Sequence, residues 1–144
     1  MYEMLDVTTP LLPANKPRYL MGVGQPEQML EAIKRGVDMF DCVLPTRNAR
    51  HGQIYLHTAN HLVDDKLEQV FYRRQNISSA QFATDTSVLD SFCVCTTCSA
   101  GYSKAYLRHL ISIGEPSGLA LATVHNVSFY VDLMKQIRQH LHTR

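Results

Sequence analysis

The densest group of reactive side chains in the sequence is a run of three thiols. Cys93, Cys95 and Cys98 lie in the hexapeptide CVCTTC and are three of the four cysteines in the chain. Disulfides are disfavoured in a chain that otherwise reads as cytosolic, so clustered thiols indicate a metal site. The C-x-C-x-x-C spacing lets three thiolates bind one ion and leaves one tetrahedral position to fill. The alternative is a set of unrelated buried or redox-active cysteines.

A histidine is the natural fourth ligand, and His125 is the best placed of the seven in the chain. It follows an apolar run and precedes an expected helix cap at Asn126, whereas His140 and His142 lie in a polar tail. A closed Cys3His site would hold one structural zinc ion, and its loss would unfold the region after residue 90. Cys42 stands apart from the cluster, and we expect it to pack in the core.

The second chemically suggestive pattern is a carboxylate inside an apolar run, Asp41 in DMFDCVLPTRNAR (residues 38–50). The run predicts a buried strand that Pro45 stops, followed by a loop that carries Arg47 and Arg50. In a parallel α/β sheet, residues at the carboxyl end of a strand face the ligand cleft. A carboxylate there, kept ionised by the nearby arginines, suits chemistry on a phosphate-bearing substrate. The alternative is a structural aspartate bound to a backbone amide or to Arg47.

The elements that must position Asp41 form a βαβ unit in the sequence pattern. Residues 18–24 (RYLMGVG) predict a short strand, Pro26 begins a helix, Gly36 closes it, and the strand that carries Asp41 follows. We expect the two strands to be parallel and the crossover to be right-handed. Residues 1–9 read as the tail of a helix, followed by a proline-rich connector.

The elements around the thiols are less regular in the sequence. Residues 52–57 alternate like a strand, residues 70–72 are a candidate partner strand, and residues 61–69 suit either a loop or a short helix. Residues 103–113 have helical periodicity. We expect residues 119–124 to form a brief strand-like run and a final helix to begin at a cap on Asn126.

Length and composition describe an ordinary globular chain. Its 144 residues suffice for about one domain but are short for a complete α/β barrel, and 45% are hydrophobic and 19% charged. Neither a signal peptide nor an apolar run of membrane-spanning length is visible, so we expect a cytoplasmic protein. The formal net charge is only +1, so any contact with nucleic acid must rest on local clusters such as Arg47, Arg50 and His51.

Five segments together resemble one enzyme family. They are RYLMGVG, GVDMFDCVLPTRNARHG, CVCTTC, SKAYLRHL and HNVSFYVDLMKQIR. They resemble bacterial-type tRNA-guanine transglycosylase, also called queuine tRNA-ribosyltransferase, over nearly all of the chain, which corresponds to about the last third of that family's polypeptide. The resemblance implies an α/β fold, the carboxyl-terminal part of a (β/α)8 barrel with an inserted zinc-binding subdomain. It also implies a transferase that exchanges guanine at tRNA anticodon position 34 for a 7-deazaguanine in queuosine biosynthesis.

The resemblance assigns roles to particular residues. Asp41 matches the nucleophile that forms a covalent aspartyl-RNA intermediate, as in retaining glycosidases. Met21 and Gly22 match residues that line the base pocket. The ligands of the structural zinc match Cys93, Cys95, Cys98 and His125. Two segments match tRNA contacts, namely Gly22, Val23, Gly24, Gln25, Pro26, Glu27 and Gln28, and Thr46, Arg47, Asn48, Ala49 and Arg50.

The family also suggests how the chain is divided and assembled. It implies one partial domain with barrel units in residues 1–50, a hairpin and zinc subdomain in 51–126 and a terminal helix in 127–144. A homodimer is implied through Tyr102, Tyr106 and His109, which recur along one stripe of the helix after the thiols. Extra residues within 56–75 enlarge the hairpin, and Ser79 and Gln81 replace basic or amide residues.

Three interpretations remain open from the sequence. The first is the carboxyl-terminal part of a transglycosylase, which works with an amino-terminal portion that carries the acid/base carboxylate. The second is a non-catalytic zinc-stabilised fragment that binds RNA or dimerises, and the third is a truncated remnant with no activity.

Overall fold

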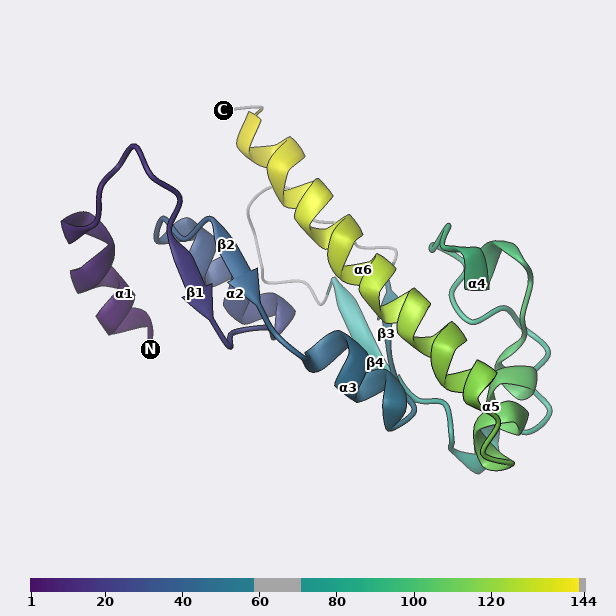
Figure 1. Ribbon diagram of the computed structural model, residues 1–144. Helices are drawn as coiled ribbons and strands as arrows, with labels where there is room; N and C mark the ends of the chain where they lie inside the picture. The colour runs from purple at the N-terminus through teal and green to yellow at the C-terminus, as the bar shows by residue number, and fades with distance from the viewer. Residues whose placement is uncertain (59–70, 143–144) are drawn as a thin grey trace. The chain divides into compact units, whose positions relative to one another are not determined.

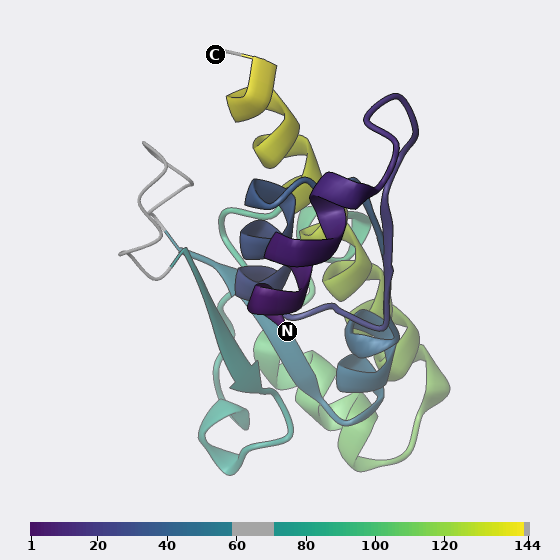
Figure 2. The ribbon, with the colours of Figure 1, turned by 90° about the vertical axis from the view of Figure 1, so that its left-hand side faces the viewer.

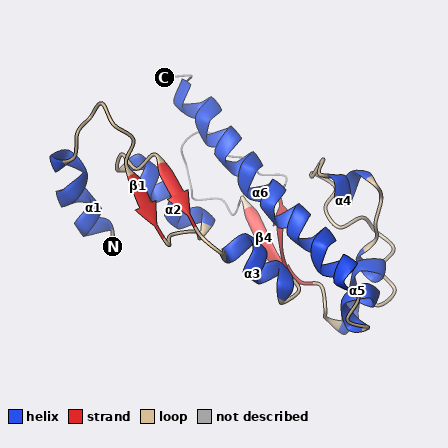
Figure 3. Ribbon diagram, viewed as in Figure 1, coloured by secondary structure: helices blue, strands red, loops and turns tan. Residues whose placement is uncertain are grey.

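The computed structural model describes residues 1–58 and 71–142, in two compact units divided between Leu44 and Pro45 (Figure 1). Unit 1 is Met1–Leu44 and unit 2 is Pro45–Arg144. Both units mix helices with short strands (Figure 3). Across the described residues, every helix falls short of the length and apolarity that crossing a membrane requires.

Unit 1 is a βαβ unit preceded by a helix, as the sequence predicts. Its elements are α1 (Tyr2–Thr8), the 3-10 turn η1 (Thr9–Leu11), β1 (Tyr19–Met21), α2 (Pro26–Lys34) and β2 (Met39–Asp41). The two strands are parallel and in register, with Tyr19 opposite Met39, Leu20 opposite Phe40 and Met21 opposite Asp41. Proline occupies the first turn of α2, where no backbone N–H is needed. Gly36 follows the helix at φ 88°, a backbone angle that favours glycine.

The two faces of the β1-β2 sheet differ in burial. Leu20 and Phe40 pack against a small core of Leu5, Ala32 and Val37. The opposite face carries Tyr19, Met21, Met39 and Asp41, all exposed. The prediction of a buried strand at Asp41 is therefore wrong for unit 1, because strands of a parallel sheet are buried only where both faces are covered.

Residues expected to form a loop after Asp41 form a helix instead. Helix α3 (Leu44–Arg50) is drawn after β2 in Figure 3. It begins one residue before Pro45 and includes both Arg47 and Arg50. Proline ends strands, but its fixed φ suits the first turn of a helix, so Pro45 marks a helix start here. The expectation of an unpaired loop at this position is wrong.

Unit 2 continues with an antiparallel pair of strands, β3 (Gln53–His57) and β4 (Tyr72–Asn76). The strand expected at 52–57 is confirmed, whereas the partner strand begins at Tyr72 and runs to Asn76. The loop or helix expected at 61–69 lies outside the described residues. Shorter elements follow, namely η2 (Ala80–Phe82), α4 (Thr96–Ser99) and α5 (Lys104–Ser112), and the helix expected at 103–113 is confirmed, with Ser103 as its cap.

The last described element is one long helix, α6 (Pro116–His142), drawn unbroken in Figure 1 and seen from a second direction in Figure 2. The strand expected at 119–124 and the cap expected at Asn126 are wrong, because both positions lie inside α6. The segment LALATV is rich in leucine and alanine, which are strong helix formers, and Pro116 starts the helix upstream. Asn126 is fully buried within α6.

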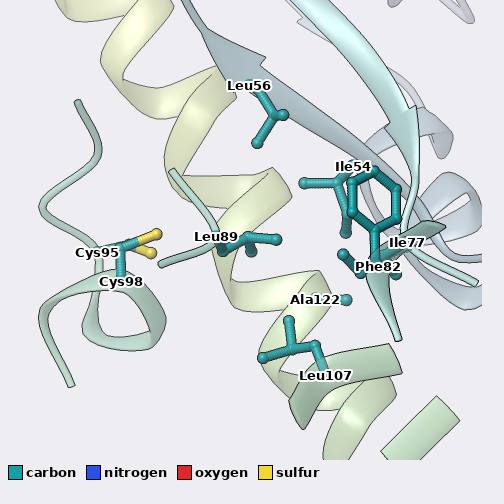
Figure 4. Close-up of a cluster of buried hydrophobic side chains, with 10 residues drawn as sticks. Ile54, Leu56, Ile77, Phe82, Leu89, Cys95, Cys98, Leu107 and Ala122 are labelled. Atoms are coloured by element: carbon teal, nitrogen blue, oxygen red, sulfur yellow. The ribbon is translucent and has the colours of Figure 1, made fainter. Parts of the chain in front are cut away.

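An apolar cluster joins several elements of unit 2 (Figure 4). Its buried members are Ala49, Ile54, Leu56, Ile77, Phe82, Leu89, Cys95, Cys98, Leu107 and Ala122. Two of the candidate metal ligands therefore belong to the same core as β3, α5 and α6. The helices after residue 90 therefore pack on this core in addition to the metal site.

Candidate metal centre and strand-end carboxylate

The three thiols and His125 converge as the sequence predicts. One ligand atom from each of Cys93, Cys95, Cys98 and His125 lies within 4.8 Å of the other three. His125 Nδ1 is 3.6 Å from Cys95 Sγ and 3.4 Å from Cys98 Sγ. A tetrahedral zinc ion with bonds of about 2.3 Å to sulfur and about 2.0 Å to nitrogen separates those atoms by about 3.5 Å. The four residues form a buried metal site that fits structural zinc.

Hydrogen bonds prepare these side chains for a cation. His125 is fully buried, and its Nε2 lies 2.6 Å from the Tyr55 carbonyl oxygen. Because a carbonyl only accepts, Nε2 carries the proton and Nδ1 is left to bind metal. A hydrogen bond from the Cys98 thiol lowers the pKa of Cys93 to about 4, and the same bond raises the pKa of Cys98. This hydrogen bond favours the thiolate of Cys93, the form in which cysteine binds metal.

Side chains around the metal site close one edge of β3. Asn126 Oδ1 accepts from the Tyr55 N–H at 3.1 Å, and Asn126 Nδ2 donates to the Gln53 carbonyl at 2.9 Å. The His57 N–H donates to Asp90 Oδ2 at 2.9 Å. The three backbone groups of β3 in these hydrogen bonds face away from β4. The side chains of Asn126 and Asp90 bond them in place of a third strand. Sequence reasoning missed this role of Asn126, although an amide among apolar helix positions is a usable signal.

A buried ion pair anchors the segment that leads into the thiols. His57 Nδ1 lies 2.8 Å from Asp90 Oδ2, and Asp90 Oδ1 accepts from the Phe92 N–H at 2.9 Å. The second ring nitrogen of His57 lies 3.4 Å from Asp132 on α6. Burial is the largest single influence and opposes charge on both partners. The hydrogen bond and charge attraction between them, together with neighbouring charges and backbone N–H groups, outweigh burial, raising the pKa of His57 and lowering that of Asp90. Sequence analysis did not single out either residue.

In unit 1, Asp41 lies at the carboxyl end of β2 with its carboxylate exposed. The Gly22 N–H donates to Asp41 Oδ1 at 2.9 Å, and the Tyr19 hydroxyl also donates to the carboxylate. The hydrogen bond from Tyr19 and then that from Gly22 lower the pKa of Asp41. These two groups, and not the arginines expected from the sequence, lower that pKa. Tyr19 could have been found from strand alternation, since it lies two residues before Met21 and shares its face.

The neighbouring segment expected to contact base and RNA follows β1. Met21 pairs with Asp41 in the sheet and is 71% exposed, and Gly22 is exposed beside it. Residues 22–28 run from this strand end into the first turn of α2. A Cβ on Gly24 would lie 2.0 Å from Cys42 Sγ, so Cys42 packs closely on this glycine, as its expected packing role requires.

The second expected RNA segment lies on α3, where side chains divide between two environments. Arg47 and Arg50 are exposed. Asn48 Nδ2 donates to the Tyr55 hydroxyl at 2.6 Å, and Ala49 is fully buried. Thr46 is half-buried. The side chains of this segment that are free to meet a ligand are therefore the two arginines.

The ring stripe expected to form a dimer contact is only partly exposed. Tyr102 and Tyr106 stack with ring centroids 5.5 Å apart and an angle of 15° between the rings. Tyr102 precedes α5 and packs against the apolar cluster of unit 2. Tyr106 and His109 are exposed on α5.

The chain is similar to known proteins over nearly its whole length. A family model described as queuine tRNA-ribosyltransferase matches residues 1–144. Proteins named queuine tRNA-ribosyltransferase from Herpetosiphon aurantiacus and from Actinobacillus pleuropneumoniae serotype 5b are each 50% identical over 139 residues, and one from Lactococcus lactis subsp. cremoris is 48% identical. Each match covers 96% of this chain and 32% of the relative, so the chain spans about a third of the length of these relatives. The chain belongs to the queuine tRNA-ribosyltransferase family.

Proposed function

We propose that the chain supplies the nucleophile-bearing, carboxyl-terminal part of a tRNA-guanine transglycosylase built on a (β/α)8 barrel. The observation that carries the proposal is the state of Asp41, an exposed carboxylate at a strand end whose pKa is lowered by Tyr19 and Gly22. An attacking carboxylate must be ionised and accessible, and both conditions hold for Asp41.

The proposed reaction is a double displacement at a ribose of tRNA anticodon position 34. An Asp41 oxygen attacks C1′, and the bond from C1′ to N9 of guanine breaks. The departing base takes the bonding electrons and a proton from the acid/base carboxylic acid of the amino-terminal portion. An incoming 7-deazaguanine then attacks C1′ through its ring nitrogen, loses its proton, and releases Asp41 as a carboxylate. Met21 and Gly22 adjoin Asp41 at the end of β1, where they would border the exchanging base.

RNA binding is proposed for two surfaces of the chain. The exposed Arg47 and Arg50 on α3 suit a single-stranded anticodon loop, whose bases and phosphates guanidinium groups bind well. Residues 22–28 would contact the nucleotides around the reacting ribose. If the arginines read bases, Arg50→Ala weakens binding of a cognate anticodon stem-loop more than binding of an unrelated hairpin. Equal loss for both RNAs would reduce the contact to phosphate.

A second candidate function is a non-catalytic, metal-stabilised module that binds RNA or dimerises. The observation that favours it is the completeness of the metal site within unit 2, which draws all four ligands from residues 93–125. For assembly, we propose a homodimer contact at Tyr106, whose ring is 45% exposed beside Tyr102. Sedimentation of the chain against Tyr106→Ala tests this contact, and identical dimers in both samples would place the interface elsewhere.

Base exchange with labelled guanine separates the two candidates. The chain is incubated with an anticodon stem-loop and radiolabelled guanine, alone and together with the amino-terminal two thirds of the Herpetosiphon aurantiacus relative. We expect label in the RNA in the second mixture and a covalent protein-RNA adduct that Asp41→Asn abolishes while RNA still binds. An adduct that persists in Asp41→Asn refutes the nucleophile, and exchange in neither mixture favours the non-catalytic module.

A further inference from the structure

Helix α3 is attached to the rest of unit 2 by two buried polar side chains. Asn126 Nδ2 on α6 donates to the Pro45 carbonyl oxygen at 3.0 Å, at the start of the helix. The Tyr55 hydroxyl on β3 accepts from Asn48 Nδ2 at 2.6 Å, in the middle of it. Ala49 adds an apolar contact, since it belongs to the buried cluster of unit 2. Three points along seven residues fix both the position and the rotation of α3.

The attachments matter because α3 is too short to hold its own shape. Isolated helices of fewer than about 12 residues are marginal in water, and α3 has seven. Its exposed cations, Arg47 and Arg50, are three residues apart and therefore lie on one side of the helix. The direction in which they are presented depends on how the opposite side, with Asn48 and Ala49, is held.

Tyr55 and Asn126 are themselves held rigidly. The Tyr55 ring stacks on Phe129 with centroids 5.5 Å apart and meets the Tyr130 ring edge-on at 5.2 Å. Asn126 is fully buried and makes three hydrogen bonds, to Pro45, Gln53 and Tyr55. A buried polar network with its members satisfied favours one arrangement, because each alternative leaves a group unpaired.

The same two residues adjoin the metal site. Asn126 follows the ligand His125 in sequence, and the Tyr55 carbonyl accepts the hydrogen bond from the His125 ring at 2.6 Å. His125 and Asn126 of α6 thus both hydrogen-bond the backbone of Tyr55, while the Tyr55 hydroxyl bonds Asn48 of α3. Tyr55 connects the buried centre of unit 2 to the helix that carries the exposed arginines.

We infer that Tyr55 and Asn126 are positioning residues for RNA binding, which orient α3 so that Arg47 and Arg50 meet the anticodon loop together. This inference rests on the proposed RNA role of α3. Neither residue touches RNA in this arrangement, since both side chains are buried beneath the helix. Their effect on RNA affinity passes through the orientation of the two arginines.

The test uses Tyr55→Phe, which removes only the hydroxyl that Asn48 binds and keeps the stacked ring. Affinity for a cognate anticodon stem-loop is measured for the wild type, Tyr55→Phe, Arg50→Ala and the double variant, with zinc content checked in each. We expect Tyr55→Phe to weaken binding about three- to tenfold, the range that one lost hydrogen bond supplies. The double variant should lose less RNA affinity than the product of the two single-variant losses, because both changes act through the same helix.

A control and a second measurement keep the outcomes distinct. Arg138 is exposed on α6, so Tyr55→Phe and Arg138→Ala should act independently of each other. Hydrogen exchange reports α3 directly, and its amides should exchange faster in Tyr55→Phe while zinc is retained.

Each result bears on one of the two claims. If Arg50→Ala leaves RNA affinity unchanged, the proposed RNA role of α3 fails, whatever hydrogen exchange shows. If Arg50→Ala weakens binding but Tyr55→Phe leaves both affinity and α3 exchange unchanged, or if the two losses simply multiply, the positioning role is overturned. Asn126→Asp, which keeps the acceptor for Tyr55 but loses the donors to Pro45 and Gln53, should reproduce the Tyr55→Phe result.

Discussion

The metal centre of unit 2 and the carboxylate of unit 1 both depend on hydrogen bonds to backbone groups, but they differ in exposure to solvent. His125 is fully buried, and its ring is oriented by a carbonyl of β3. Asp41 is exposed, and its carboxylate is held by a backbone N–H and a tyrosine hydroxyl. A structural metal site needs isolation from water and competing ligands, whereas the nucleophile that we propose at Asp41 needs a path for its substrate.

The two sites also differ in how much buried apolar packing surrounds them. Unit 2 surrounds its ligands with an apolar cluster drawn from α3, β3, η2, α4, α5 and α6 as well as the segments between them. Unit 1 buries only Leu5, Ala32 and Val37 in its cluster and leaves one face of its sheet exposed. We therefore expect disruption of unit 2 to cost stability and disruption around Asp41 to change chemistry with little effect on stability.

The largest expected effect is that of removing metal from unit 2. Structural zinc contributes on the order of 10 kcal/mol in small metal domains, comparable with the whole unfolding free energy of a domain. Chelation, or Cys98→Ser, should speed hydrogen exchange of β3 and α6 about a hundredfold or more. Exchange of β1 and α2 should stay unchanged, and Cys42→Ser is the matched control that keeps one zinc per chain. Equal acceleration of hydrogen exchange in both units would show that the metal stabilises unit 1 as much as unit 2.

The next effect comes from truncating one aromatic ring in each unit. Phe129 is 2% exposed and packs against Tyr55, so Phe129→Ala should destabilise unit 2 by about 3–5 kcal/mol. Phe40 is only half-buried, so Phe40→Ala should cost about 1–2 kcal/mol. Denaturant titration followed by hydrogen exchange in each unit measures both values. A larger cost for Phe40→Ala would mean that unit 1 has the stronger core.

A smaller difference is expected between ion pairs of the two units. His57→Asn removes a partner of the buried Asp90 and should destabilise unit 2 by about 1–3 kcal/mol. Arg35 pairs with Glu31 and Asp6 at distances of 2.6 and 3.1 Å, but Asp6 is largely exposed. Arg35→Gln should therefore cost less than about 1 kcal/mol. The two variants compared by thermal unfolding in low and high salt check this ordering, since salt should weaken only the exposed pair.

The smallest effect on stability belongs to Tyr19→Phe, which changes the acidity of Asp41. The tyrosine hydroxyl stabilises the carboxylate and lowers its pKa, so its removal raises that pKa. Any step that needs ionised Asp41 is lost as the pH falls through this pKa, and the loss should begin at a higher pH in Tyr19→Phe. Carboxyl carbon chemical shifts followed by NMR titration measure the change without requiring catalysis. An unchanged Asp41 titration would show that Gly22 alone holds the carboxylate.

The local sequence pattern was sufficient to predict an element wherever that element and its partners lie close in sequence. The βαβ unit was predictable because proline and glycine mark both ends of α2 and the two strands are neighbours along the chain. The helix α5 was predictable from its periodicity and its serine cap. Pro45 was not predictable in the same way, since proline can end a strand or start a helix. Which of the two occurs depends on whether the following residues pack against another part of the protein. Helix α3 does so through Ala49.

The sequence by itself determined the metal ligands, because three thiols within six residues can converge on one ion in almost any fold. It also placed Asp41 at a strand end. Only the tertiary structure decided which groups support them, since Asn126 meets Tyr55 across 71 residues and Asp90 meets His57 across 33. Such pairs depend on strand register and on α6 continuing unbroken from Pro116 past Asn126. Both are fixed by packing between distant segments, which no local pattern of residues contains.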